Sequence, residues 1–328
     1  MPMQEPNSLE NLNIEVNEFS DDFQNKGVCK FLFRPDHYAL FSKLKTFLDN
    51  ECFDLENLKI STQVIDLNPQ HYTAWYFRRK IISENYFENE NKKELLKEEL
   101  RFVRDICERA PKCYQSWWHM RIIREWLGFD IEELKFISKQ LEADAKNMYV
   151  WNHRTWFIRK YNSIENDLLI KELDFIAKMI SEDCRNNSAW CYRHFIFTNL
   201  KKMNALTESD LFEEVDYIVN WLMFAPHNDS IWNYIISFFS KIMVDENFNK
   251  KTLIKNLSLE NAPKNFKDAI DEIYINHYDS CYQVVYIKAC MAYEEGDKDF
   301  VLKAFQLLQS VDPIRRFYWK WKADNLKI

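Results

Sequence analysis

The segment Asn68-Pro-Gln-His-Tyr-Thr-Ala-Trp75 is the first of five similar stretches, each ending in a tryptophan and running straight into a helix-like sequence. The other four are Ala110-Pro-Lys-Cys-Tyr-Gln-Ser-Trp117, Asp144-Ala-Lys-Asn-Met-Tyr-Val-Trp151, Asp183-Cys-Arg-Asn-Asn-Ser-Ala-Trp190 and Ala225-Pro-His-Asn-Asp-Ser-Ile-Trp232. The tryptophans are 42, 34, 39 and 42 residues apart. Self-similarity at a period of about 20 to 50 residues is typical of repeat proteins, in which each unit covers its apolar face with the next. The pattern therefore predicts an all-α solenoid.

Each repeat is predicted to be a helical hairpin. In the first, a tryptophan helix over 75–87 is followed by a polar turn and an amphipathic helix over 95–109, whose leucines and isoleucines recur with helical spacing. The second-helix pattern returns at 131–141, 169–180 and 211–224. Pro69, Pro111 and Pro226 are expected in first helical turns, where a missing N–H costs nothing. Beyond Trp232 the motif fades, as expected of repeats that cap a stack.

Composition excludes several classes of protein. Three glycines in 328 residues leave little for Rossmann or phosphate-binding loops. A net charge of −7 argues against nucleic acid or an anionic membrane as the main partner. No apolar run reaches the roughly 18 residues of a transmembrane helix, and no signal peptide is apparent. Eight scattered cysteines lack any C-x-x-C pair, so they are expected to be buried thiols in a cytoplasmic protein.

Two regions are expected along the chain. Residues 1–28 are polar and acidic, and we predict a flexible N-terminal arm there. Residues 29–328 are predicted to form a single helical-repeat domain, because stacked repeats share one continuous core.

The repeat residues are expected to have structural roles. Each tryptophan offers a large apolar surface plus one N–H that needs an acceptor, which is typical of core packing between hairpins. The five are Trp75, Trp117, Trp151, Trp190 and Trp232. Three arginines follow three residues later (Arg78, Arg154 and Arg193) and are expected to bond carbonyls or carboxylates of the neighbouring hairpin. The histidines are spread singly, and no metal-binding or nucleophile motif occurs, so no metal site is predicted.

The repeats resemble those of protein prenyltransferase α subunits. The pattern N-x-x-x-W-x-x-R, Pro111-Lys-Cys-Tyr-Gln-Ser-Trp117, Asp144-Ala-Lys-Asn147, Asp183-Cys-Arg-Asn-Asn-Ser-Ala-Trp190 and the closing Asp312-Pro-Ile-Arg-Arg-Phe-Tyr-Trp319 are similar to the α subunit shared by farnesyltransferase and type I geranylgeranyltransferase. The likeness spans about 34–321 and keeps the order of all five repeats. It implies an α-α superhelix, a crescent solenoid of tetratricopeptide-like hairpins.

The resemblance also implies an enzyme that is active only as a heterodimer. A partner β subunit would carry the catalytic zinc, and this chain would bind no cofactor; whether the holoenzyme needs Mg²⁺, and whether two alternative β chains share this subunit, stay open. The reaction would transfer an isoprenoid from its diphosphate to the cysteine thiol of a C-terminal CaaX sequence.

Site residues follow from the resemblance position by position. Lys112 would neutralise the diphosphate leaving group and Tyr114 would hydrogen-bond it. Gln115 would hold the free carboxylate of the CaaX peptide. Lys146, Asn147 and Tyr149 would lie on the diphosphate side. The chain departs from the family pattern at four positions that usually hold asparagine, arginine, tyrosine and histidine, which are Cys113, Met120, Met148 and Tyr149.

Two alternatives stay open. A non-catalytic tetratricopeptide-like adaptor would bind peptides, but such proteins usually keep a regular spacing of about 34 residues. The α subunit of the Rab-type geranylgeranyltransferase is the other. The asparagine-rich fourth repeat resembles the farnesyl type more closely, and no leucine-rich tail follows residue 321.

Overall fold

The computed structural model describes residues 34–163, 167–243 and 262–326. The predicted arm at 1–28 therefore lies outside the described residues. The described part is helical and contains no strand, which confirms the predicted all-α class. It divides into two compact units, Met1–His153 and Arg154–Ile328. The single domain over 29–328 stays a prediction.

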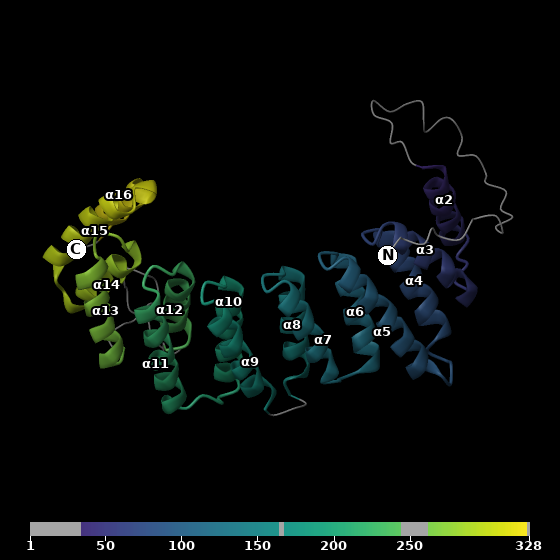
Figure 1. Ribbon diagram of the computed structural model, residues 1–328, viewed down its shortest axis with the longest axis horizontal. Coiled ribbons are helices and arrows are strands. Elements are labelled where there is room, and N and C mark those ends of the chain that lie inside the picture. Colours follow the sequence, from purple (N-terminus) through teal and green to yellow (C-terminus); the bar gives the residue numbers. More distant parts are fainter. Residues whose placement is uncertain (1–33, 164–166, 244–261, 327–328) are drawn as a thin grey trace. The chain divides into compact units, whose positions relative to one another are not determined.

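The first unit is built from antiparallel helices joined by short loops (Figure 1). Its elements are α2 (Pro35–Asp49), η2 (Leu55–Asn57), α3 (Leu58–Leu67), α4 (Tyr72–Asn85), α5 (Lys92–Arg109), α6 (Tyr114–Leu127), α7 (Glu132–Ala143) and the first part of α8 (Met148–Tyr161). Sequential helices contact each other, and α4 also contacts α6, so the tryptophan helices of successive repeats lie side by side.

The second unit continues the alternation of helices. It holds the rest of α8, then α9 (Leu168–Glu182), α10 (Asn187–Lys202), α11 (Glu208–Phe224), α12 (Asp229–Lys241), α13 (Lys264–His277), α14 (Tyr282–Glu295), α15 (Lys298–Val311), η3 (Pro313–Arg315) and α16 (Arg316–Asp324). Here α10 contacts α12, and α11 contacts α13, so alternate helices again form two layers. The predicted second helices at 169–180 and 211–224 match α9 and α11.

Every repeat tryptophan is the fourth residue of its helix and lies in the core. Trp75 is fully buried, and its Nε1–H donates to the carbonyl oxygen of Pro69 at 2.7 Å. The other four indoles make the same bond to the residue six positions earlier, at 2.7 to 2.9 Å. Each loop therefore supplies the acceptor that a buried N–H requires.

The prediction for the prolines is wrong in its detail. Pro69, Pro111 and Pro226 lie in the turn before the helix, three residues ahead of its first residue, and not in the first helical turn. The reason is the indole bond, because the carbonyls of these prolines must sit below the helix N-terminus to accept it.

A buried carboxylate joins three successive helices in each repeat. Arg78 on α4 donates from Nε and Nη2 to both oxygens of Glu99 on α5, each at 2.7 Å. His119 on α6 lies with its Nε2 2.6 Å from the same carboxylate. The acid thus belongs to the second helix of the same hairpin, and the neighbouring hairpin contributes the imidazole. Arg78 also donates to Ser61 and Thr62 on α3.

The same arrangement recurs in the second unit with tyrosine in place of histidine. Arg154 bonds Glu172 at 2.6 and 2.7 Å, and the Tyr192 hydroxyl donates to that carboxylate at 2.5 Å. Arg193 bonds Glu214 through Nε at 2.7 Å, and the Tyr234 hydroxyl also donates to Glu214 at 2.7 Å. The repeating trio of arginine, glutamate and histidine or tyrosine is called the carboxylate ladder below.

The second repeat keeps the ladder although Met120 occupies the position that holds arginine in the other three ladder repeats. Glu133 on α7 is bonded by His153 at 2.8 Å and by Arg104 from the preceding α5 at 2.5 Å. Arg124 lies 3.6 Å from the same carboxylate. The positive charge therefore comes from two other helical positions.

Candidate functional site

The predicted site residues lie on two loop-to-helix junctions of the first unit, at 110–115 and 144–149. The two junctions are bonded to each other. Asn147 donates from Nδ2 to the carbonyl oxygen of Pro111 at 3.2 Å, and Lys112 Nζ lies 3.3 Å from Asp144 Oδ2. The structure thus brings together segments that are more than thirty positions apart.

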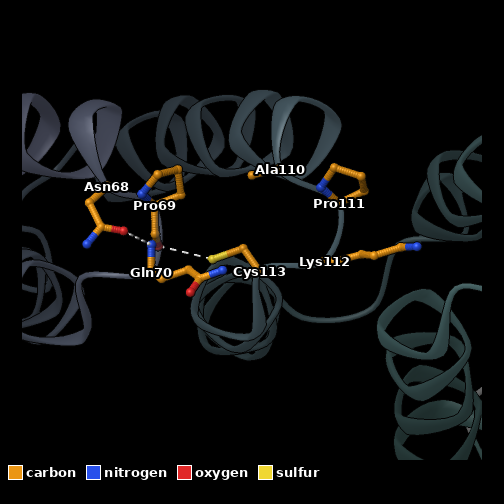
Figure 2. Close-up of a pocket in the computed structure, with 7 residues that line it drawn as sticks. All are labelled: Asn68, Pro69, Gln70, Ala110, Pro111, Lys112 and Cys113. Carbon is orange, nitrogen blue, oxygen red and sulfur yellow. Dashed lines mark hydrogen bonds between the residues drawn. The ribbon is translucent and has the colours of Figure 1, made fainter.

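Lys112 is a well-exposed cation of this pair of loops, with 71% of its side chain exposed. Figure 2 shows its side chain extending away from the other residues of the neighbouring cleft. Its one described ion-pair partner is Asp144, whose other oxygen accepts the backbone N–H of Lys146 at 3.2 Å. Asp144 is a functional candidate that the sequence analysis missed. An ion pair between exposed side chains is weak, so an arriving anion can displace it.

Tyr114 and Gln115 are the first two residues of α6. The Tyr114 side chain is 60% exposed, and its ring lies parallel to that of Trp118 with centroids 6.5 Å apart. Gln115 is half-buried, and its Oε1 accepts a bond from the Cys113 thiol at 3.5 Å. Both side chains start at a helix N-terminus, where unpaired N–H groups favour negative charge. This position suits the diphosphate and carboxylate roles predicted for them, which stay predictions.

Asn147 differs from its neighbours because it is buried. Its Oδ1 accepts the backbone N–H groups of Tyr149 and Val150 at 2.9 and 3.4 Å, while its Nδ2 is bound to Pro111. The side chain therefore caps α8 and joins two loops, and a direct bond to diphosphate would require exchanging these contacts. Lys146 is exposed and Tyr149 is half-buried, both beside the same helix N-terminus. The substrate roles of all three stay predictions.

A cleft of about 350 Å³ opens between the loops of the first two repeats. Its lining residues are Asn68, Pro69, Gln70, Ala110, Pro111, Lys112 and Cys113 (Figure 2). Cys113 donates from its thiol to the Pro69 carbonyl at 3.0 Å. This bond links the two loops that line the cleft, and Lys112 lies at the rim of the cleft.

No group of three or more histidine, cysteine, aspartate or glutamate side chains within 34–163, 167–243 and 262–326 could bind a metal ion. None of the helices in that part of the chain is long and apolar enough to cross a bilayer.

Four repeats match a known protein family. The family is described as protein prenyltransferase alpha subunit repeat, and the matched residues are 54–85, 96–127, 130–161 and 169–200. The chain carries prenyltransferase α-subunit repeats. Each match pairs an amphipathic helix with the following tryptophan helix, and the second and third prenyltransferase α repeats contain the two junctions described above.

Individual relatives are similar over part of the chain. The type-2 geranylgeranyl transferase α subunit of Candida albicans is 31% identical over 124 residues, which cover 34% of this chain and 32% of that protein. The Dictyostelium discoideum subunit of the same name is 30% identical over 124 residues, which cover 35% of this chain and 38% of that protein. The matched stretches thus span about a third of the length of these relatives.

This chain is similar in fold to a chain in the solved structure of Candida albicans protein geranylgeranyltransferase-I complexed with GGPP. The TM-score is 0.76 at 23% identity, over 92% of this chain and 94% of that chain. This likeness confirms the predicted α-α superhelical fold class and, at such identity, speaks to the fold alone.

Proposed function

We propose that this chain is the α subunit of a heterodimeric protein prenyltransferase. The observation that carries the proposal is the pair of α-repeat junctions tied together by the Asn147–Pro111 and Lys112–Asp144 contacts, which present exposed cations at two helix N-termini. Such a surface suits an isoprenoid diphosphate.

The proposed reaction forms a bond from the cysteine sulfur to the isoprenoid carbon as the bond from that carbon to the diphosphate oxygen breaks. The diphosphate leaves with the electron pair, so negative charge grows on its oxygens in the transition state. Lys112 would exchange Asp144 for this anion, and Tyr114 would donate a hydrogen bond to it. The thiolate would come from the substrate cysteine, and zinc on the partner would favour its deprotonated form. Gln115 would hold the peptide carboxylate.

We propose CaaX proteins as the substrates, with farnesyltransferase or type I geranylgeranyltransferase as the holoenzyme. The residue pattern of the second to fourth repeats supports this. A Rab-type enzyme is the second candidate, because the two relatives named above are type-2 α subunits. The adaptor alternative is weakened, because the matched repeats are those of prenyltransferase α subunits.

The test is co-expression with each candidate β subunit, followed by assays of lipid transfer with and without zinc and Mg²⁺. Transfer to CaaX peptides supports the first assignment, and transfer to Rab proteins instead supports the second. A complex that transfers nothing, or no complex at all, would contradict the proposal.

Lys112→Ala sharpens this test. We expect the heterodimer to form normally while turnover falls roughly 10- to 100-fold, because the lost charge acts mainly on the leaving group. Lys135→Ala is the matched control, since Lys135 is also an exposed lysine of the first unit paired with a carboxylate, Glu132, at 2.6 Å. Equal activity of the two variants in a verified heterodimer would remove Lys112 from the mechanism.

A further inference from the structure

Two neighbouring tryptophan helices repeat a pattern of which the candidate site uses only Tyr114. On α4, Tyr72, Tyr76 and Arg79 are spaced by four and three residues, which places them on one face of the helix. Tyr72 is 75% exposed and Tyr76 is 46% exposed. Trp75 and Arg78 of the same helix, in contrast, are buried.

Helix α6 carries the same pattern at the same positions. Tyr114, Trp118 and Arg121 have the same spacing, and the rings of Tyr114 and Trp118 stack on each other. Trp118 is 42% exposed. Helices α4 and α6 contact each other within the first unit (Figure 1), so the two faces are considered together as one surface. It is called the aromatic–arginine face and consists of Tyr72, Tyr76, Arg79, Tyr114, Trp118 and Arg121.

Arg79 has an unusual environment. It is half-buried, and burial lowers the pKa of its guanidinium. Among the residues that the structure describes, no hydrogen bond, ion pair or ring contact offsets this loss of hydration. The preceding Arg78, in contrast, has its guanidinium bonded to Glu99 and to α3. A charge withdrawn from water without a counter-ion costs stability.

Burial also lowers the pKa of Arg121 on α6, so the surface contains two partly desolvated guanidinium groups beside exposed rings. Arginine, tyrosine and tryptophan are the residue types that dominate binding energy at protein interfaces, and the strongest contacts lie where charges become fully desolvated against a partner. Glu125 acts electrostatically on Arg121, so Arg79 is the guanidinium of this surface that lacks a counter-charge among the described residues.

We propose that the aromatic–arginine face docks the partner subunit through a carboxylate that pairs with Arg79, with apolar side chains of the partner packing on the surrounding rings. This inference rests on the proposed function. The occupant is a folded protein surface with an aspartate or glutamate set among apolar residues. Charge complementarity selects it, because an apolar occupant would leave Arg79 buried and unpaired.

The test uses Arg79→Met, which keeps the apolar stem and removes the charge. In the co-expressed heterodimer we expect the variant chain to dissociate at least 10-fold faster. The rate is measured from the exchange of the variant with labelled wild-type chain. The chain alone, unfolded in urea at high dilution, should show an unchanged or higher midpoint. The two effects have opposite directions because the charge helps only when the partner is bound. Arg101→Met, which removes an exposed arginine 3.8 Å from Glu98 on α5, is the control and should change neither measurement.

Other outcomes overturn the inference. A lower urea midpoint for Arg79→Met alone would mean that a carboxylate of this chain already pairs with Arg79. Unchanged exchange would mean that the face lies outside the interface, and loss of self-association in the variant would make a second copy the occupant. If the wild-type chain binds no candidate β subunit, the proposed function fails first, which separates that failure from the others.

Discussion

The residue four positions before a repeat tryptophan links one repeat to the next at Cys113, Asn147 and Asn228. Asn147, and Asn228 in the second unit, caps its own helix through Oδ1 and donates from Nδ2 to the loop carbonyl of the preceding repeat. Cys113 keeps only the second contact, because a thiol can donate to the Pro69 carbonyl but accepts weakly from backbone N–H groups. Cys281 makes the same contact, with the Pro226 carbonyl at 3.3 Å.

Exchanging these residues should therefore change stability in opposite directions. Cys113→Asn adds a cap to α6 and should raise the free energy of unfolding by about 1 kcal/mol, while Asn147→Cys should lower it by about the same amount. Urea unfolding followed by tryptophan fluorescence measures both. Asn91→Cys is the control, because Asn91 precedes α5 without a side-chain cap and is exposed. Destabilisation by Cys113→Asn would show that the loop cannot accommodate the longer amide.

At the scale of the elements, the carboxylate ladder sets how neighbouring helices pair. Each buried glutamate binds a cation from one helix and a histidine or tyrosine from another, so a slipped helix would leave a charge unpaired. Replacing one partner of such a buried pair typically costs about 3 to 5 kcal/mol. The ladder is therefore a device for register more than a net source of stability.

The ladder also makes stability depend on pH. Burial alone would raise the pKa of Glu99, but Arg78 and His119 outweigh it and hold the pKa at about 2. Glu133 is likewise held at about 2 against its own burial, by His153 and then Arg104. Burial lowers the pKa of His119 and of His153.

We therefore expect stability to fall with acid in two stages. All four groups have lower pKa values folded than unfolded, so the unfolded chain binds more protons and stability rises with pH. The histidine contribution is lost as pH falls below about 6.5, and the glutamate contribution as pH falls from about 4.5 towards 2.

Urea unfolding at several pH values should show a shallower dependence of the unfolding free energy on pH between about pH 7 and 5 for His119→Gln. His227→Gln, which removes an exposed imidazole, is the control. Stability that rises on acidification would contradict the ladder's electrostatics.

At the scale of the whole molecule, each unit exposes large apolar side chains that its own core does not use. In the second unit these include Ile314 at 94%, Phe224 at 74%, Phe317 at 71% and Trp321 at 60% exposure. The first unit adds the aromatic–arginine face. Surfaces of this kind in soluble proteins usually mark sites of association.

The isolated chain should consequently bind a hydrophobic dye and aggregate on gentle warming, while the co-expressed heterodimer should do neither. Light scattering and dye fluorescence, with and without the β subunit at equal chain concentration, provide the measurement. A clear, thermally stable monomer with no dye binding would argue that these side chains cover no obligate interface.

Much of the fold could be predicted because the repeat signals are local. The tryptophan, the helical spacing of apolar residues and the polar turns lie within a few residues of each other, so they predicted the hairpins of 68–224 closely. The fourth residue of α14 is Val285 and not tryptophan, yet this helix begins after Cys281 with the loop contact of the earlier repeats. The contact persists there through a different residue, which a search for tryptophan does not detect.

By itself the sequence determined the all-α repeat class, the helix that follows each tryptophan and the two junctions that carry Lys112 and Lys146, because contiguous residues encode all of these. Only the tertiary structure decided which charges meet. Arg104 and Arg124 replace the cation missing at Met120, Asp144 pairs with Lys112, and Arg79 stays unpaired beside the fully bonded Arg78. The physical reason is that ion pairing depends on distances between helices, which follow from packing and not from spacing along the chain.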